Sequence, residues 1–70
     1  MKAQDFLAWT KATGLTTARQ AYEELGASRN LVQQWYADAE AGKELTIKRH
    51  VALAMTAIAQ GLKPWDEYER

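Results

Sequence analysis

The chain contains no cysteine and a single proline among its 70 residues. Without cysteine, neither a disulfide framework nor a thiolate metal site can hold the fold together, so apolar packing must do so. A domain of this size buries only roughly 60% of the surface of its unfolded chain, which leaves little room for a deep active site. Hydrophobic residues make up 47% of the chain and include three tryptophans, enough for one small core. We therefore expect residues 1–70 to form a single domain.

Long apolar runs and groups suited to catalysis are also missing. No stretch of about 18 apolar residues exists and the start, MKAQDFLAW, is charged, so we expect no membrane span, no signal peptide and a cytoplasmic location. There is one histidine, and no glycine-rich phosphate loop or metal-ligand spacing. We predict a protein that is not an enzyme and that has no catalytic residues, metal, cofactor or small-molecule ligand.

Charge is balanced overall but unevenly distributed. Nine basic and nine acidic residues cancel, whereas nucleic-acid-binding proteins usually carry a basic excess. The stretch from Leu45 to Trp65 nevertheless has no acid, and its basic residues are Lys48, Arg49, His50 and Lys63. The tail after Pro64 contains Asp66, Glu67, Glu69 and Arg70. A neutral chain can therefore still present a locally positive face.

Periodicity predicts two helices in the first part of the chain. The first runs from Ala3 to Ala12 and ends before Gly14, which suits a left-handed helix end, and Leu15 then fills the core. The second begins at Thr16 or Thr17, and Gln20 completes a capping box for Thr17. The inward residues of these helices are expected to be Phe6, Trp9, Ala18, Ala21, Tyr22 and Leu25.

A third helix is predicted from Arg29 to Ala39, after Gly26 and an N-capping Ser28. Its apolar stripe is formed by Leu31, Val32 and Trp35. Its opposite face is formed by Arg29, Asn30, Gln33 and Gln34. A helix, a tight turn with glycine and a second helix with an outward polar face together have the form of a helix-turn-helix.

The fourth helix is expected from Ile47 to Gln60, capped by Thr46 and stopped by Gly61, after a loop around Gly42. Its core stripe is Ile47, Val51, Ala54, Met55 and Ile58. Leu62 and Trp65 should then fold back over the bundle. Together with Tyr68 they are expected to form either a lid on the core or a dimer contact. We expect residues 64–70 to be a tail that is either flexible or in contact with the second subunit of a dimer.

In order, the chain contains FLAW, GLTT, ELGASRNLVQQW and RHVALAMTAIAQGLKPW. From Phe6 to Trp65 this succession resembles the small Cro/CI-type (XRE-like) helix-turn-helix proteins of phages and bacteria. The resemblance implies an all-α, lambda repressor-like domain, a compact bundle of four to five helices. It departs from the family pattern at Tyr22, where alanine is usual, and at Thr17 or Ala18, where glutamine is usual.

The resemblance implies a regulator that binds operator DNA as a homodimer, a phage or prophage repressor acting in a bacterial cell. Amide side chains suit adenine and guanidinium suits guanine, so the expected base-reading residues are Arg29, Asn30, Gln33 and Gln34. The expected phosphate contacts are Thr17, Ser28, Lys43, Lys48 and Arg49. The expected dimer contacts are Leu62, Trp65 and Tyr68.

An alternative remains open at this stage. The same scaffold can serve as a protein-binding module, such as an antirepressor or a small phage inhibitor of a host protein. Zero net charge, Tyr22 and the acidic tail favour this alternative. The surface around Trp65 and Tyr68 would then contact the partner.

Overall fold

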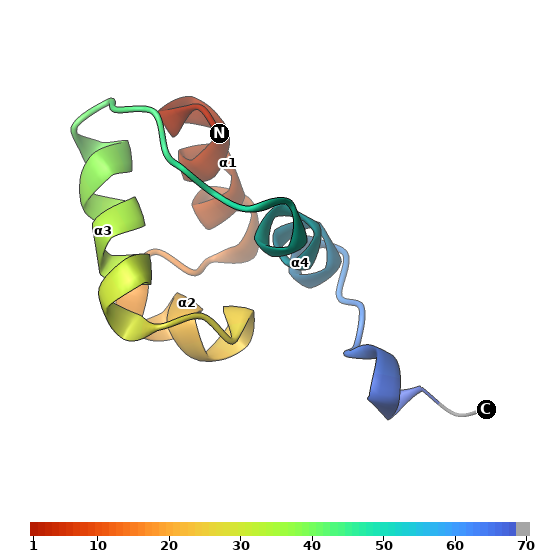
Figure 1. Ribbon diagram of the computed structural model, residues 1–70. Coiled ribbons are helices and arrows are strands. Elements are labelled where there is room, and N and C mark those ends of the chain that lie inside the picture. The colour runs from red at the N-terminus through yellow and green to blue at the C-terminus, as the bar shows by residue number, and fades with distance from the viewer. Residues whose placement is uncertain (69–70) are drawn as a thin grey trace.

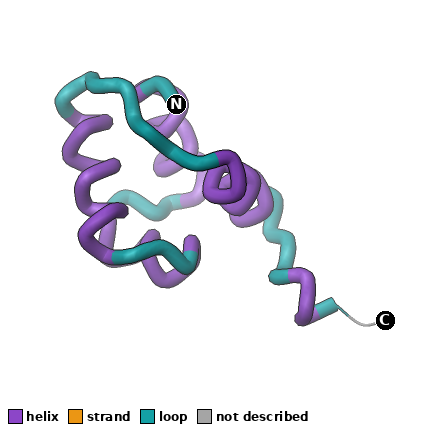
Figure 2. The backbone as a smooth tube through the Cα atoms, viewed as in Figure 1, coloured by secondary structure: helices purple, strands orange, loops and turns teal. Residues whose placement is uncertain are grey.

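The computed structural model describes residues 1–68, in which four α-helices and a short 3₁₀ helix are connected by loops and no strand occurs (Figures 1 and 2). The elements are α1 (Ala3–Thr13), α2 (Ala18–Leu25), α3 (Arg29–Glu40), α4 (Arg49–Ala59) and η1 (Trp65–Glu67). The predicted all-α class is confirmed. Within the described part, none of the helices combines the length and apolarity needed to cross a bilayer. Positions 69 and 70 of the predicted tail lie outside the described residues.

Helices α1 and α2 each contact both α3 and α4. The buried core between the helices consists of Phe6, Trp9, Ala21, Val32, Trp35, Ala39, Leu45 and Met55. The predicted inward positions of α2 are confirmed, because Ala21 is fully buried and its three companions pack against the core. Burial of this apolar surface is the main stabilising term for a chain without disulfides.

An aromatic contact that the sequence analysis missed joins α1 to α3. Tyr36 of α3 meets Phe6 edge-on, with ring centroids 5.1 Å apart and planes at 90°. Its hydroxyl donates a hydrogen bond of 2.5 Å to the backbone carbonyl of Leu15. This one side chain therefore links α3 to α1 and to the loop before α2, and its polar end is satisfied where it enters the core.

Helix ends follow the local sequence closely. Thr17 caps α2, and its capping box with Gln20 is complete: the Thr17 side chain accepts from the Gln20 N–H, and the Gln20 side chain accepts from the Thr17 N–H. Gly14 and Gly26 end α1 and α2 in the left-handed conformation, with φ of 75° and 68°. These local predictions are confirmed, with Thr17 rather than Thr16 as the cap.

The predicted start of the fourth helix is wrong. Thr46 is not its cap, because α4 starts at Arg49 and its N-cap residue is Lys48, which makes no side-chain capping hydrogen bond. Leu45 exchanges two backbone hydrogen bonds with Met1, each 2.8 Å long, and is buried. These bonds hold the chain before α4 against the start of α1, and Ile47 packs on the core from a non-helical position.

The predicted core lid is also wrong. Leu62 and Trp65 are 53% and 75% exposed, and Figure 1 shows the segment after α4 leading away from the other helices. Gly61 turns the chain out of α4 with φ of 70°, and Pro64 is extended. The aromatic rings of Trp65 and Tyr68 then contact each other, with centroids 6.3 Å apart. The segment forms its own small aromatic contact instead of covering the bundle.

Candidate nucleic-acid interface

The connection between α2 and α3 is a tight turn of residues 26–28. The Gly26 N–H donates to the carbonyl oxygens of Tyr22 and Glu23, at 3.0 and 3.3 Å, which closes the end of α2. A Cβ atom at Gly26 would meet nothing within 4 Å. The positive φ of this residue, and not a lack of space, therefore selects glycine here.

Ser28 ends the turn and begins α3. Its backbone is extended and its hydroxyl oxygen accepts a hydrogen bond of 3.2 Å from the N–H of Leu31. The predicted N-cap is confirmed. Because the side chain is exposed, Ser28 also stands on the surface at the positive end of the α3 dipole.

The two faces of α3 differ as predicted. On the inner face, Val32, Trp35 and Ala39 are at most 3% exposed. The outer face carries the four polar residues proposed to read bases, and all of them are exposed: Arg29, Asn30, Gln33 and Gln34. Among the described residues no other segment covers this face, so a surface one helix wide is accessible along α3.

Gln34 is held differently from its neighbours. Its Nε2 donates a hydrogen bond of 2.8 Å to Oδ1 of Asp38, one turn further along α3. A glutamine that pairs with adenine needs both its N–H and its carbonyl groups, so Asp38 competes with a base for Gln34. The spacing of four residues between an amide and a carboxylate is the signal that sequence reasoning overlooked.

Leu31 is the one member of the predicted apolar stripe that is not buried. It is 48% exposed, because α3 lies against α1 and α2 and not against α4 in the described part of the chain. The space between the start of α3 and the start of α4 is a groove of about 480 Å³. Its lining residues are Leu25, Gly26, Ala27, Ser28, Leu31, Trp35, Thr46, Lys48, His50 and Val51.

The proposed phosphate contacts divide into two groups. Ser28 and Lys48 line the same groove, and Arg49 follows Lys48 at the start of α4. This end of α4 has no acidic residue in its first turn and no side-chain cap, so its free N–H groups favour an anion. The start of α3 and the start of α4 thus present two helix N-termini and a lysine beside one groove.

The remaining two candidates lie apart from that group. Lys43 follows the C-terminal end of α3, whose 12 residues span about 18 Å from the Ser28 end. Thr17 is exposed at the start of α2, but its hydroxyl is within 3.1 Å of the Gln20 side-chain oxygen. A phosphate would have to compete with Gln20 for this hydroxyl.

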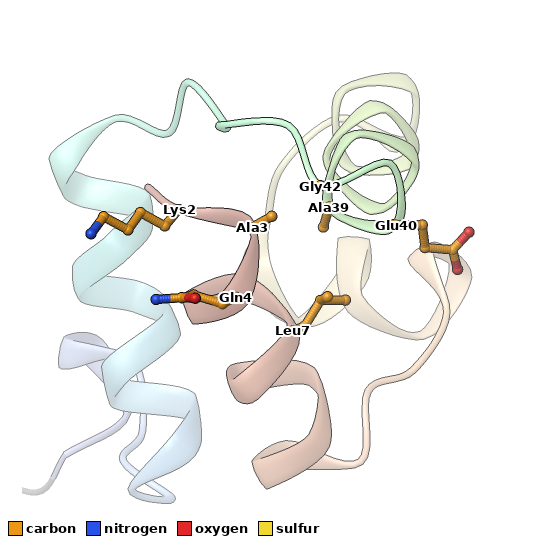
Figure 3. A pocket seen from close by; sticks show the side chains of 7 residues that line it. All are labelled: Lys2, Ala3, Gln4, Leu7, Ala39, Glu40 and Gly42. Atoms are coloured by element: carbon orange, nitrogen blue, oxygen red, sulfur yellow. The ribbon is translucent and has the colours of Figure 1, made fainter.

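A second hollow on the surface has charged side chains that do not converge on it. It lies between the start of α1 and the end of α3 and has a volume of about 450 Å³. Figure 3 shows the Lys2 amine and the Glu40 carboxylate pointing in opposite directions from it. No group of three or more histidines, cysteines or carboxylates able to hold a metal ion occurs in the described residues.

Comparison with known proteins identified no relative of this chain: no protein-family model, no curated protein and no solved structure matches it.

Proposed function

We propose that this domain is a DNA-binding transcriptional regulator of the Cro/CI type, which binds operator DNA as a homodimer through a helix-turn-helix made of α2 and α3. One observation carries the proposal. The polar face of α3 is exposed along the helix while its other face forms part of the core, and α3 starts directly after a glycine turn and a serine cap.

The dimensions and chemistry of this face suit the major groove. That groove of B-DNA is about 12 Å wide and admits one α-helix. Asn30 and Gln33 have side-chain amides that can pair with N6 and N7 of adenine, and Arg29 can pair with O6 and N7 of guanine. None of these three side chains makes a hydrogen bond to another described residue, so none has to break an internal hydrogen bond to reach a base.

Phosphate contacts from two helix starts would set the register of α3 on the duplex. Ser28 and Lys48 flank one groove, so one strand of the DNA backbone running past it would meet both helix N-termini. Contacts of this kind position the protein and carry no base information. Zero net charge predicts that nonspecific affinity is weak and that specific contacts on α3 supply most of the selectivity.

The experiment is a selection of bound sequences from random duplex DNA, followed by titration of the selected site with the native protein and variants. Gln33→Ala should cost about 1–3 kcal/mol on the selected site and relax one base position. Gln4→Ala, which removes an exposed amide from α1, is the matched control and should bind as the native protein does. Failure to select any sequence, or equal behaviour of the two variants, would rule out this face as the reader.

A further inference from the structure

The groove between the start of α3 and the start of α4 has the size and lining of a small-molecule site. Its volume is about 480 Å³, and ligand pockets measure roughly 300–1,000 Å³. Its apolar lining comes from three helices and includes Leu25, Leu31, Trp35 and Val51. Trp35 is 3% exposed and Leu31 48%, so this apolar lining extends from the core to the surface.

The polar groups at the α4 side of the groove favour an anion. Among the described residues that line it, Lys48 and His50 are the only titratable ones, and none is acidic. The N–H groups of Val51 and Ala52 donate to the Lys48 carbonyl oxygen, whereas those of Arg49 and His50 have no partner among the described residues. A negative group at this end would meet a lysine, two free N–H groups and the positive end of the α4 dipole.

A buried donor in the lining also lacks a partner. Trp35 lines the groove, and its indole N–H is buried and makes no hydrogen bond to another described residue. Buried polar groups of folded proteins are nearly always paired with the protein or with water. The unpaired indole N–H is therefore an indication, independent of the charge at the α4 side, that the groove takes an acceptor oxygen from outside the chain.

We propose that the groove binds a small organic acid whose apolar body carries one acceptor oxygen. The carboxylate lies at Lys48 and the start of α4, the body packs against Leu31, and the acceptor oxygen takes the indole N–H of Trp35. Sequence reasoning predicted no small-molecule ligand, because the two walls of the groove come from separate segments, residues 25–35 and 46–51.

The bound acid excludes DNA from this part of the surface. Its carboxylate occupies the position beside Ser28 and Lys48 that is proposed for a backbone phosphate, so acid and duplex compete for the same groups. This part of the inference rests on the proposed function, to which it adds a regulatory ligand. The binding of the acid itself does not depend on it.

Binding is measured without DNA, by titration of para-benzoylbenzoate into the native chain and NMR of the indole and backbone N–H signals. Saturable shifts are expected for the Trp35 indole and for the Arg49 and His50 amides, with a Kd of about 1 mM or tighter for a probe of this size. Acetate, a carboxylate without the apolar body, should cause no saturable shift. The uncharged para-(hydroxymethyl)benzophenone should bind about fivefold more weakly than para-benzoylbenzoate.

Variants test the contacts one at a time. Lys48→Ala should weaken binding of para-benzoylbenzoate about fivefold, and Leu31→Ala about threefold, because part of the apolar wall is lost. Lys11→Ala and Leu7→Ala, at exposed positions of α1 outside the groove, are the matched controls and should bind as the native chain does. Replacing the ketone of the probe by a methylene, in para-benzylbenzoate, should weaken binding to the native chain about fivefold. Trp35→Phe should bind these two probes equally, because the donor is gone, and circular dichroism confirms that each variant folds.

Exclusion of DNA is measured separately, by fluorescence anisotropy of a labelled operator. Saturating para-benzoylbenzoate should release the operator, and acetate at the same concentration should not. The absence of a saturable shift, or equal binding of the charged and uncharged probes, overturns the site, and a bound probe that leaves the operator in place overturns the exclusion. Failure of the chain to bind any duplex contradicts the proposed function and the exclusion with it, whereas the binding of the probe is decided without DNA.

Discussion

The indole N–H of Trp9 in α1 donates a hydrogen bond of 2.8 Å to the backbone carbonyl oxygen of Met55 in α4. Both residues belong to the core. The indole N–H of Trp35, the other buried tryptophan, has no hydrogen-bond partner among the described residues. Two side chains of the same type thus make opposite contributions through the same polar group, since burial of an unpaired donor costs free energy.

Replacement of each tryptophan by phenylalanine separates these contributions. Trp9→Phe loses a hydrogen bond with a net value of about 1 kcal/mol, whereas Trp35→Phe removes an unpaired donor whose burial costs about 1–3 kcal/mol. Both variants lose a similar apolar volume. Trp9→Phe should therefore lower the free energy of unfolding by about 2–4 kcal/mol more than Trp35→Phe, as measured by urea unfolding with circular dichroism. Equal losses would show that the two indole groups are equivalent.

Local features of this fold could be predicted from the sequence because neighbouring residues determine them. The Thr17 capping box, the Ser28 cap and the left-handed glycines need only a few residues on either side, and all occur where the sequence indicated. The buried face of α3 followed from the spacing of Val32 and Trp35. The exposed polar face of α3 could be predicted for the same reason, since it is the opposite side of that stripe.

Features that depend on distant contacts were missed. Leu45 is buried because it pairs with Met1, 44 residues away, and no local pattern indicates this. Leu31 has the spacing of a core residue, but α4 does not lie against α3 to cover it. The segment with Leu62 and Trp65 was expected on the bundle because it is apolar, yet it leads away from it. An apolar composition indicates that a residue tends to be buried, but it does not show which other segment of the chain packs against it.

Gly26 offers a test of why the turn between α2 and α3 requires glycine. Its φ is 68° and a Cβ would meet nothing within 4 Å, so a substitution costs conformational energy and causes no clash. Gly26→Ala should destabilise the domain by about 1–2 kcal/mol. Gly26→Asn should cost less, because asparagine tolerates the left-handed conformation better.

Thermal unfolding of the two Gly26 variants, followed by circular dichroism, gives the order of stability. A loss for asparagine as large as that for alanine, or larger, would point to crowding at the turn and contradict the conformational explanation.

Lys48 is expected to contact a DNA phosphate from the start of α4. Lys48→Ala should weaken binding to every duplex alike and lower the slope of log affinity against log salt concentration by about one. Lys2→Ala is the control, because Lys2 lines the other hollow, between the start of α1 and the end of α3 (Figure 3). Fluorescence anisotropy with a labelled operator at several salt concentrations measures both slopes. An unchanged slope for Lys48→Ala would remove this residue from the interface.

Because of the Tyr36 hydroxyl, we expect the domain to lose stability at high pH. Burial raises the pKa of Tyr36 from 10.0 to about 12. Below pH 10 the group is protonated in both the folded and the unfolded chain, so its contribution to stability is complete. Between pH 10 and 12 the unfolded chain releases the proton and the folded chain keeps it, so the free energy of unfolding falls as pH rises.

Tyr36→Phe should remove this contribution. At neutral pH the variant should be less stable by about 1 kcal/mol, because it lacks the hydrogen bond to Leu15. Urea unfolding from pH 9 to 12 should show the native chain losing its advantage over the variant as the pH passes 10. Tyr68→Phe, in the exposed segment after α4, should follow the native curve. A constant difference between the native chain and Tyr36→Phe would mean that the hydroxyl ionises equally in the folded and unfolded chain, and that its burial does not keep it protonated.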